Sequence, residues 1–313
     1  MDFFQSQDFL NDGIGDNFSP EIQKQGYPII SYRVTFETFK IEFFHLPYFY
    51  APYYPDNSSR LGFGIEFDNN YAVKTSKEVI KEGPELNQYG GKLDIYSSFI
   101  DLTIGFFHLI DRGLSLTLTD QSNQLNRYFF ETNYYFTHFQ YANEHFLLKG
   151  QYYFKDYQDI EVKVQDLISG DPILVGPKNH SMMGFGFETK IPFFENHDLT
   201  FLAEYQKLLG VNETLARRYS IFSNDAAWGF RWQLNDIKNK QLTLMHIIDL
   251  DISQEQIYQV DYRQNITDNS KINFGLRIIE ASKDSDAFSF DNLSGLAIVD
   301  DADSVYATLT YIF

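Results

Sequence analysis

Two histidines stand beside residues that could assist them in catalysis. His197 precedes Asp198, and His180 precedes Ser181, and these residue types can supply a base with its orienting acid or its nucleophile. Neighbouring residues on a strand point to opposite faces, so neither pair can form a dyad by itself. The sequence also lacks the GxSxG, GxxxxGK[ST], HExxH and GxGxxG motifs. We therefore predict that the protein is not an enzyme and has no catalytic residues.

Acidic side chains gather in the segment 280–303. Its carboxylates, set against the single Lys283, are Glu280, Asp284, Asp286, Asp291, Asp300, Asp301 and Asp303. Oxygen-only clusters attract calcium or magnesium, but this spacing matches no twelve-residue calcium loop. A solvated acidic surface is therefore the preferred interpretation, with no metal site and no cofactor. If this segment folds over the mouth of a pore, we expect the pore to favour cations.

Charges of both signs recur at every second position of several segments. The candidates for a pore lining are Arg33, Glu131, Lys149, Glu188, Lys190, Glu204, Arg231, Asp249, Asp261, Arg263 and Arg277. Opposite charges facing each other across a wet lumen would create the transverse field of a general diffusion channel. Alternatively, they are interior ion pairs that brace the wall or fill a narrow barrel.

The sequence pattern of the segments that carry these charges predicts β-strands. In 224–234, Ala226, Trp228, Phe230 and Trp232 alternate with polar or small residues, which is the period of a strand with one apolar face. Similar alternation predicts the strands 29–37, 39–46, 89–97, 100–109, 127–137, 144–154, 182–191, 197–206, 224–234, 240–250, 254–266, 270–279 and 304–313. Many of them match the roughly 9 to 11 residues with which a tilted strand crosses a bilayer.

The connections between these strands alternate between short turns and long loops. Residues 47–88, 110–126, 155–181, 207–223 and 280–303 form the predicted long loops, as on the outer side of bacterial barrels. Residues 1–28 are predicted to be irregular, and 29–313 to form the barrel. The strand list is odd, whereas such barrels usually close with an even number. We expect the true first strand to precede this chain; an extra strand at 61–68 or 113–120 is the alternative.

Composition narrows the classes of protein further. The 313 residues carry a net charge of −18 and are 18% aromatic. An acidic chain is a poor partner for nucleic acid, whereas aromatic side chains favour strands and membrane interfaces. There is no cysteine, which excludes disulfides and thiolate sites. No run of about 18 apolar residues predicts a membrane helix, and the first residues do not resemble a secretory signal.

The C-terminus carries the most specific pattern. Val305, Ala307, Leu309, Tyr311 and the final Phe313 alternate with more polar residues. This resembles the C-terminal assembly signal of Gram-negative outer-membrane β-barrel proteins, and the strand layout over 29–313 resembles their porin-like channels. The resemblance implies location in the outer membrane, contact with lipid and lipopolysaccharide, insertion by the barrel-assembly machinery, passage of small hydrophilic solutes, and the homotrimer as one expected assembly.

The resulting prediction is an all-β, transmembrane, antiparallel up-and-down barrel of about 14 strands (about 12 to 16) that forms a porin-like channel. A non-channel barrel with a plugged lumen, serving adhesion, assembly or a structural role, is the second interpretation. A soluble, carbohydrate-binding β-sandwich is the third.

Overall fold

The computed structural model describes residues 12–14, 23–25, 28–51, 67–75, 79–81, 85–118, 125–158, 160–165, 172–194, 197–252, 255–281, 296 and 303–311. Strands dominate these residues, and the prediction of an all-β, antiparallel up-and-down fold is confirmed. In this part of the chain, no helix combines the length and the apolar character needed to cross a membrane.

The chain divides into two compact units, and each is described separately. Unit 1 comprises residues 1–4, 139–151 and 182–313, and unit 2 comprises residues 5–138 and 152–181. The unit boundaries fall within β9 (Leu125–Ala142), within β10 (Phe146–Asp156) and after the first two residues of β13 (His180–Phe194).

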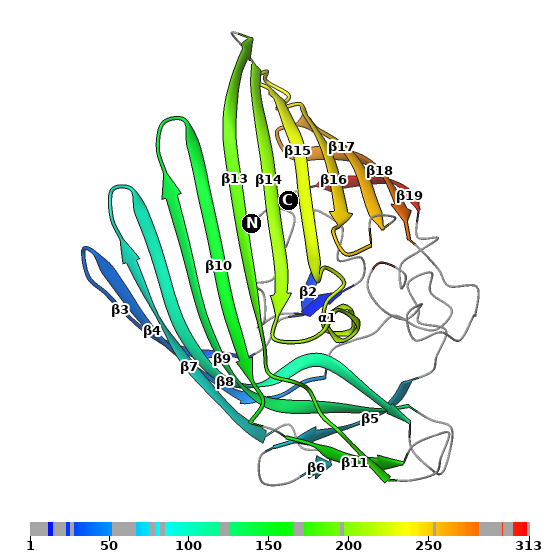
Figure 1. Cartoon of the computed structure of the whole chain (residues 1–313). Coiled ribbons are helices and arrows are strands. Elements are labelled where there is room, and N and C mark those ends of the chain that lie inside the picture. Colours follow the sequence, from blue (N-terminus) through cyan, green and yellow to red (C-terminus); the bar gives the residue numbers. More distant parts are fainter. Residues whose placement is uncertain are drawn as a thin grey trace. The chain divides into compact units, whose positions relative to one another are not determined.

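One hydrogen-bonded sheet of 15 strands contains most of the described residues, and two of its strands, β5 (Phe67–Lys74) and β6 (Val79–Lys81), lie off the main path. The path follows the sequence, so each strand lies beside the preceding path strand (Figure 1). In unit 2 and at the boundary, the strands are β3 (Ile30–Thr35), β4 (Phe39–Tyr48), β7 (Glu85–Tyr96), β8 (Ile100–Leu118), β9 (Leu125–Ala142) and β10 (Phe146–Asp156). In unit 1 they are β13 (His180–Phe194), β14 (His197–Leu209), β15 (Asn224–Leu234), β16 (Gln241–Asp249), β17 (Gln256–Thr267), β18 (Ser270–Glu280) and β19 (Ser304–Tyr311).

The path strands lie where period-two alternation predicts them, but several are longer, above all β8 and β9. Strand β8 runs to Leu118 and β9 begins at Leu125, so the predicted loop 110–126 is largely strand. The alternative extra strand at 113–120 is wrong as a separate element, because residues 113–118 continue β8. Leu114, Leu116 and Leu118 keep the period of two that begins at Ile100, so the sequence gives no signal for a turn there.

Shorter elements occupy several predicted loops. Strands β5 (Phe67–Lys74) and β6 (Val79–Lys81) lie in 47–88, the hairpin of β11 (Val162–Gln165) and β12 (Pro172–Val175) lies in 155–181, and helix α1 (Glu213–Tyr219) lies in 207–223. Strands β1 (Asp12–Ile14) and β2 (Gln23–Gln25) pair within 1–28. The alternative strand at 61–68 overlaps β5 only at its end, and residues 61–66 lie outside the described residues.

Helix α1 has a clear local cause. The side chain of Asn212 accepts a hydrogen bond from the N–H of Leu215 at 2.9 Å, which caps the first turn. Glu213 in that turn favours the positive end of the helix dipole. At the other end, the N–H of Ser220 donates to the carbonyl of Ala216 at 3.1 Å. The cap fixes α1 between β14 and β15, where it presents Arg217.

Candidate functional site: the polar face of the sheet

The strands of unit 1 expose large apolar side chains on one face and, on the other, bury polar side chains together with some aliphatic ones. Trp228 of β15 is 46% exposed and Phe274 of β18 is 47% exposed, whereas Arg277, on the opposite face of β18, is 1% exposed. Other exposed apolar side chains on the same face are Trp232, Leu244, Tyr258, Val260, Leu276, Ile278, Val305, Leu309 and Tyr311. This distribution is inverted relative to a sheet whose apolar face packs in a dry core.

Aromatic rings lie side by side at one level of this apolar face. Trp228, His246 and Tyr258 are register partners on β15, β16 and β17. The imidazole of His246 stacks on Tyr258, with centroids 4.6 Å apart, and meets Trp228 edge-on at 5.5 Å. A row of this kind, rich in Trp and Tyr, is typical of a membrane–water interface.

The polar face of unit 1 is held together by side-chain hydrogen bonds across β17, β18 and β19. Arg277 Nε donates to Gln259 Oε1 at 3.3 Å, and Gln259 Nε2 donates to Asp261 Oδ2 at 2.5 Å. The hydroxyl of Tyr306 donates to Asp261 Oδ1. These contacts satisfy groups that would be costly to bury unpaired.

Gly275 makes this arrangement sterically feasible. It is the register partner of both Asp261 and Tyr306. A Cβ atom at position 275 would lie 2.0 Å from Cζ of the Tyr306 ring. Only glycine therefore lets the ring lie across β18 and reach Asp261.

The other predicted pore-lining residues of unit 1 also occupy the polar register. Lys149 and Glu188 form an ion pair, and Lys190 lies 3.8 Å from Asp198. Glu204, Arg231 and Arg263 alternate with the apolar residues on the opposite face of β14, β15 and β17. That these residues line a pore stays a prediction.

An acidic group ends the polar face of unit 1 near α1. Asp225 and Asp249 are register partners, Glu255 precedes β17, and all three are almost completely buried. Arg217 of α1 forms an ion pair with Glu255. Burial raises the pKa of Glu255, although the neighbouring guanidinium opposes that shift.

In unit 2, charges of the polar face alternate in sign across the strands. Arg33 Nη2 lies 2.7 Å from Glu42 Oε1, and Lys92 Nζ lies 3.8 Å from Glu42 Oε2. On the next row, Lys40 Nζ lies 2.8 Å from Asp94 Oδ2, and Thr103 donates to Asp94 Oδ1 at 2.7 Å. Each carboxylate is thus held by cations of adjacent strands.

Further along the same face, unit 2 becomes aromatic. Phe107, Leu109, Tyr134 and Phe136 form a buried cluster, against which Phe44 and Tyr153 pack. The rings of Phe107 and Phe136 stack at 5.8 Å. This part of the face is a packed apolar core.

Glu131 does not lie on the polar-register face, where it was predicted to line a pore. It alternates with the buried Thr132 and Tyr134, and so shares a face with Tyr135, which is 44% exposed. His108 Nε2 lies 3.1 Å from Glu131 Oε1, and His108 Nδ1 lies 3.0 Å from Asn133 Oδ1. Aromatic residues occupy both faces of β9, so the hydrophobic pattern does not distinguish its two faces.

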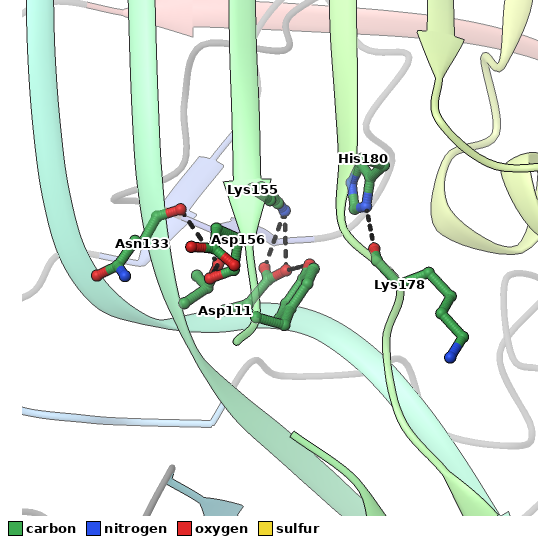
Figure 2. A network of polar contacts seen from close by, with 8 residues as sticks. Asp111, Asn133, Lys155, Asp156, Lys178 and His180 are labelled. Carbon is green, nitrogen blue, oxygen red and sulfur yellow. Dashed lines mark hydrogen bonds and ion pairs between the residues drawn. The ribbon is translucent and has the colours of Figure 1, made fainter. Parts of the chain in front are cut away.

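A second polar network in unit 2 reaches from β8 to β10 across β9, which lies between them in the sheet (Figure 2). Lys155 Nζ donates to both carboxylate oxygens of Asp111, at 3.0 and 2.9 Å, and the hydroxyl of Tyr157 donates to the same carboxylate. His180 instead contacts the carbonyl of Lys178 at 2.9 Å. Lys155, Asp111 and Tyr157 thus form a network of charge-assisted hydrogen bonds.

Within each of the two histidine pairs that suggested catalysis, the two side chains lie on opposite faces of the strand. His197 Nδ1 accepts from Trp232 Nε1 at 3.0 Å, whereas Asp198 lies near Lys190 and Asn235. The Ser181 hydroxyl lies 2.8 Å from the hydroxyl of Tyr152, so its side chain lies on the face opposite to that of His180. The opposite orientation of adjacent strand residues accounts for both cases.

Strand β19 contains most of the predicted C-terminal assembly signal. Val305, Ala307, Leu309 and Tyr311 share the apolar face and pair in register with β18. Phe313 and most of the acidic segment 280–303 lie outside the described residues.

Sequence reasoning missed several residues of the polar face. Asp225 follows the alternation of Arg231 and could have been found by extending that pattern toward the start of β15. Arg217 and Tyr157 carried no such signal, because they lie outside the strands. Compared with models of known families and with curated proteins, the chain matches none.

Proposed function

We propose that this protein is a porin-like channel of a Gram-negative outer membrane, through which small hydrophilic solutes or ions diffuse passively. The observation that carries the proposal is the inverted distribution of side chains in unit 1, where Trp and Phe face outward and Arg277 is buried. In lipid, an apolar outer face gains the favourable contact that a soluble sandwich obtains from its core.

Strand dimensions support the same environment. β15 has 11 residues, within the range of about 9 to 11 that a tilted strand needs to cross a bilayer. The row of Trp228, His246 and Tyr258 provides the side chains favoured at an interface. Closure of the sheet, insertion by the barrel-assembly machinery, contact with lipopolysaccharide and assembly into a homotrimer belong to the proposal.

A channel also requires a polar surface for solutes. Among the described residues, the polar face carries both signs, from Arg33 and Lys149 to Glu188 and Asp261. A wall with charges of both signs is suited to general diffusion of small hydrophilic solutes.

The membrane environment is tested with two variants, each of which places one positive charge on a different face of β16. Leu244 lies on the exposed apolar face, and Thr243 beside it lies on the polar face. We expect Leu244→Arg to destabilise the inserted protein by roughly 2–4 kcal/mol if the site lies near the bilayer midplane, with Thr243→Arg much milder. In a soluble sandwich, exposed Leu244→Arg would change stability by about 0.5 kcal/mol or less.

Quenching gives an independent readout of the same face. Both tryptophans of the chain, Trp228 and Trp232, lie on it. Lipids brominated on their acyl chains should quench most of the fluorescence of the inserted protein. Fluorescence unaffected by these lipids would contradict a lipid-facing sheet.

Channel activity is tested by single-channel conductance in a planar bilayer with a salt gradient. Stable steps are expected, and the reversal potential reports the preferred ion sign. The acidic segment 280–303 predicts cations. Inserted protein, identified by the quenching above, that never conducts would contradict the channel while leaving the membrane fold intact.

A barrel with a filled lumen is the second candidate, favoured by one observation. Phe107, Tyr134 and Phe136 pack into an apolar cluster on the polar-register face of unit 2, where an aqueous lumen would favour polar side chains. Such a barrel would serve adhesion, assembly or a structural role, and the silent outcome above is the one it predicts.

A further inference from the structure

Two aspartates face each other at the end of β15 and β16. The N–H of Leu250 donates to the carbonyl of Asn224 at 2.8 Å, so the adjacent register pair, Asp225 and Asp249, falls at a position without mutual backbone hydrogen bonds. Cross-strand Cα atoms come closest at such positions, at about 4.5 Å. The two carboxyl groups therefore project side by side from the same face.

Each carboxyl group has one oxygen bound and one free of partners among the described residues. Asp225 Oδ2 accepts from the N–H of Asn224 at 3.0 Å, and Asp249 Oδ1 accepts from those of Asp251 and Ile252 at 2.7 and 2.8 Å. Asp225 Oδ1 and Asp249 Oδ2 are buried without a hydrogen-bond partner. The residues themselves are 0% and 1% exposed, so leaving either oxygen without a hydrogen-bond donor is energetically costly.

The surroundings offer little to compensate two negative charges. The next row of the polar face is apolar, with Ala227, Ile247 and Ile257 all buried. Arg217 of α1 interacts with Asp249 but already pairs with Glu255.

The other charged groups nearby are acidic. Asp251 Oδ1 accepts from Asn224 Nδ2 at 2.6 Å, and the register partner of Ala227 on β14 is Glu204. Gln206, the register partner of Asp225, is neutral.

We propose that Asp225 and Asp249 together bind one proton. The protonated carboxyl of one residue donates its O–H to the free carboxylate oxygen of the other, so both orphaned oxygens gain a partner and the pair carries one negative charge instead of two. Like carboxylates at close range commonly share a proton in this way.

A proton fits this site better than a metal ion. Calcium takes six to eight oxygen ligands, and magnesium usually retains several waters. Two free carboxyl oxygens in a site with 0–1% exposure provide the two partners that a shared proton requires. The proposal does not depend on channel activity.

The shared proton also stabilises the contact with α1. When the proton leaves, Asp249 competes with Glu255 for the Arg217 guanidinium. Since Glu255 additionally accepts from the N–H of Leu296 at 3.3 Å, weakening its ion pair loosens three segments at one end of unit 1. Alkaline pH should therefore loosen this end first.

The experiment compares Asp225→Asn and Asp249→Asn with the wild type between pH 5 and 9, using urea unfolding of micelle-refolded protein followed by tryptophan fluorescence. The native pair binds a proton that the unfolded chain has released above about pH 4, so wild-type stability must fall as pH rises. One extra proton corresponds to a tenfold fall in the folding equilibrium constant per pH unit. In each Asn variant the amide replaces the shared donor, so the part of the slope that the shared proton contributes should disappear.

Asp198→Asn is the matched control, because Asp198 lies in the same unit but its side chain is 43% exposed. It should retain the wild-type slope. Glu255 contributes a slope of the same sign in every variant, so the difference between variants is the relevant quantity.

Infrared difference spectroscopy provides a readout that does not require unfolding. The carbonyl band of a protonated aspartate, identified by isotope labelling, should be present at pH 7 in the wild type and absent in Asp225→Asn. An unchanged pH slope in both Asn variants, or no such band in the wild type, would overturn the proposal. So would calcium-dependent stabilisation that EDTA and Asp225→Asn both abolish.

Discussion

The polar-register face of the sheet is built differently in the two units. In unit 1, the residues along β17 to β19 are joined by polar contacts from Arg277 through Gln259 to Asp261 and Tyr306. In unit 2, a short stretch of alternating charges around Glu42 and Asp94 gives way to the aromatic cluster of Phe107. One face therefore relies on directed hydrogen bonds in one region and on packing in the other.

This difference shows two ways in which one face of the sheet is stabilised. Packed aromatic rings provide dispersion and burial without any need for polar partners. Buried charges are tolerated only while their partners stay in place. Unit 1 should therefore respond to the loss of single polar groups and to pH, and unit 2 to the loss of volume.

The largest effect is expected from Phe107→Ala in unit 2. Phe107 is 2% exposed and stacks on Phe136, so its truncation should lower the free energy of unfolding by about 3–5 kcal/mol through lost burial and a cavity. Urea unfolding in micelles measures this change. Phe106→Ala, on the opposite face, is the control and should cost less. Equal losses would show that the cluster is no core.

Arg217→Met in unit 1 should have the next largest effect, about 2–3 kcal/mol at pH 8, because it leaves Glu255 buried without its cation. Burial raises the pKa of Glu255, so its folded state binds a proton that the unfolded chain releases. The variant should therefore be most stable at acidic pH and lose stability as pH rises through the folded-state pKa.

Adding Glu255→Gln to Arg217→Met provides the control for that variant. The neutral amide removes the buried charge, so the double variant should recover stability and lose the part of the pH dependence that Glu255 contributes. No recovery would show that Arg217 acts by packing alone.

Gly275→Ala tests the polar network of unit 1 through its geometry. The new Cβ atom would lie 2.0 Å from the Tyr306 ring, so the ring must move away from Asp261, at a cost of about 1–3 kcal/mol. Unfolding midpoints measure the change. In a Tyr306→Leu background, the same substitution should cost much less; an undiminished cost would place the clash elsewhere.

The smallest effect is expected at the exposed turn between β15 and β16. A hydrogen bond from Lys240 lowers the pKa of Asp236, and the same contact raises the pKa of Lys240. The pair therefore contributes stability from the unfolded pKa of the carboxyl, near 4, up to that of the lysine, near 10.4, and loses it outside this window. Asp236→Asn should remove this small contribution, and added salt should have the same effect on the wild type.

Alternation predicted much of the fold because it directly records which side of a strand meets an apolar environment. It placed Trp228 and Arg231 on opposite faces of β15, and the structure agrees. It failed at Glu131, where Tyr134 and Tyr135 put a large aromatic residue on each face of β9. It also ended β8 too early, because strand length depends on the pairing of neighbouring strands.

The sequence by itself determined the path strands, their order along the chain and most of their two-sided character, since a period of two follows from the geometry of the extended backbone. Only the tertiary structure decided that Asp225 faces Asp249, that Arg217 reaches Glu255 from a loop helix, and that Tyr306 crosses Gly275 to Asp261. Such contacts depend on strand register and on how loops return to the sheet. These are set by the pairing of segments far apart in the chain, which no local pattern encodes.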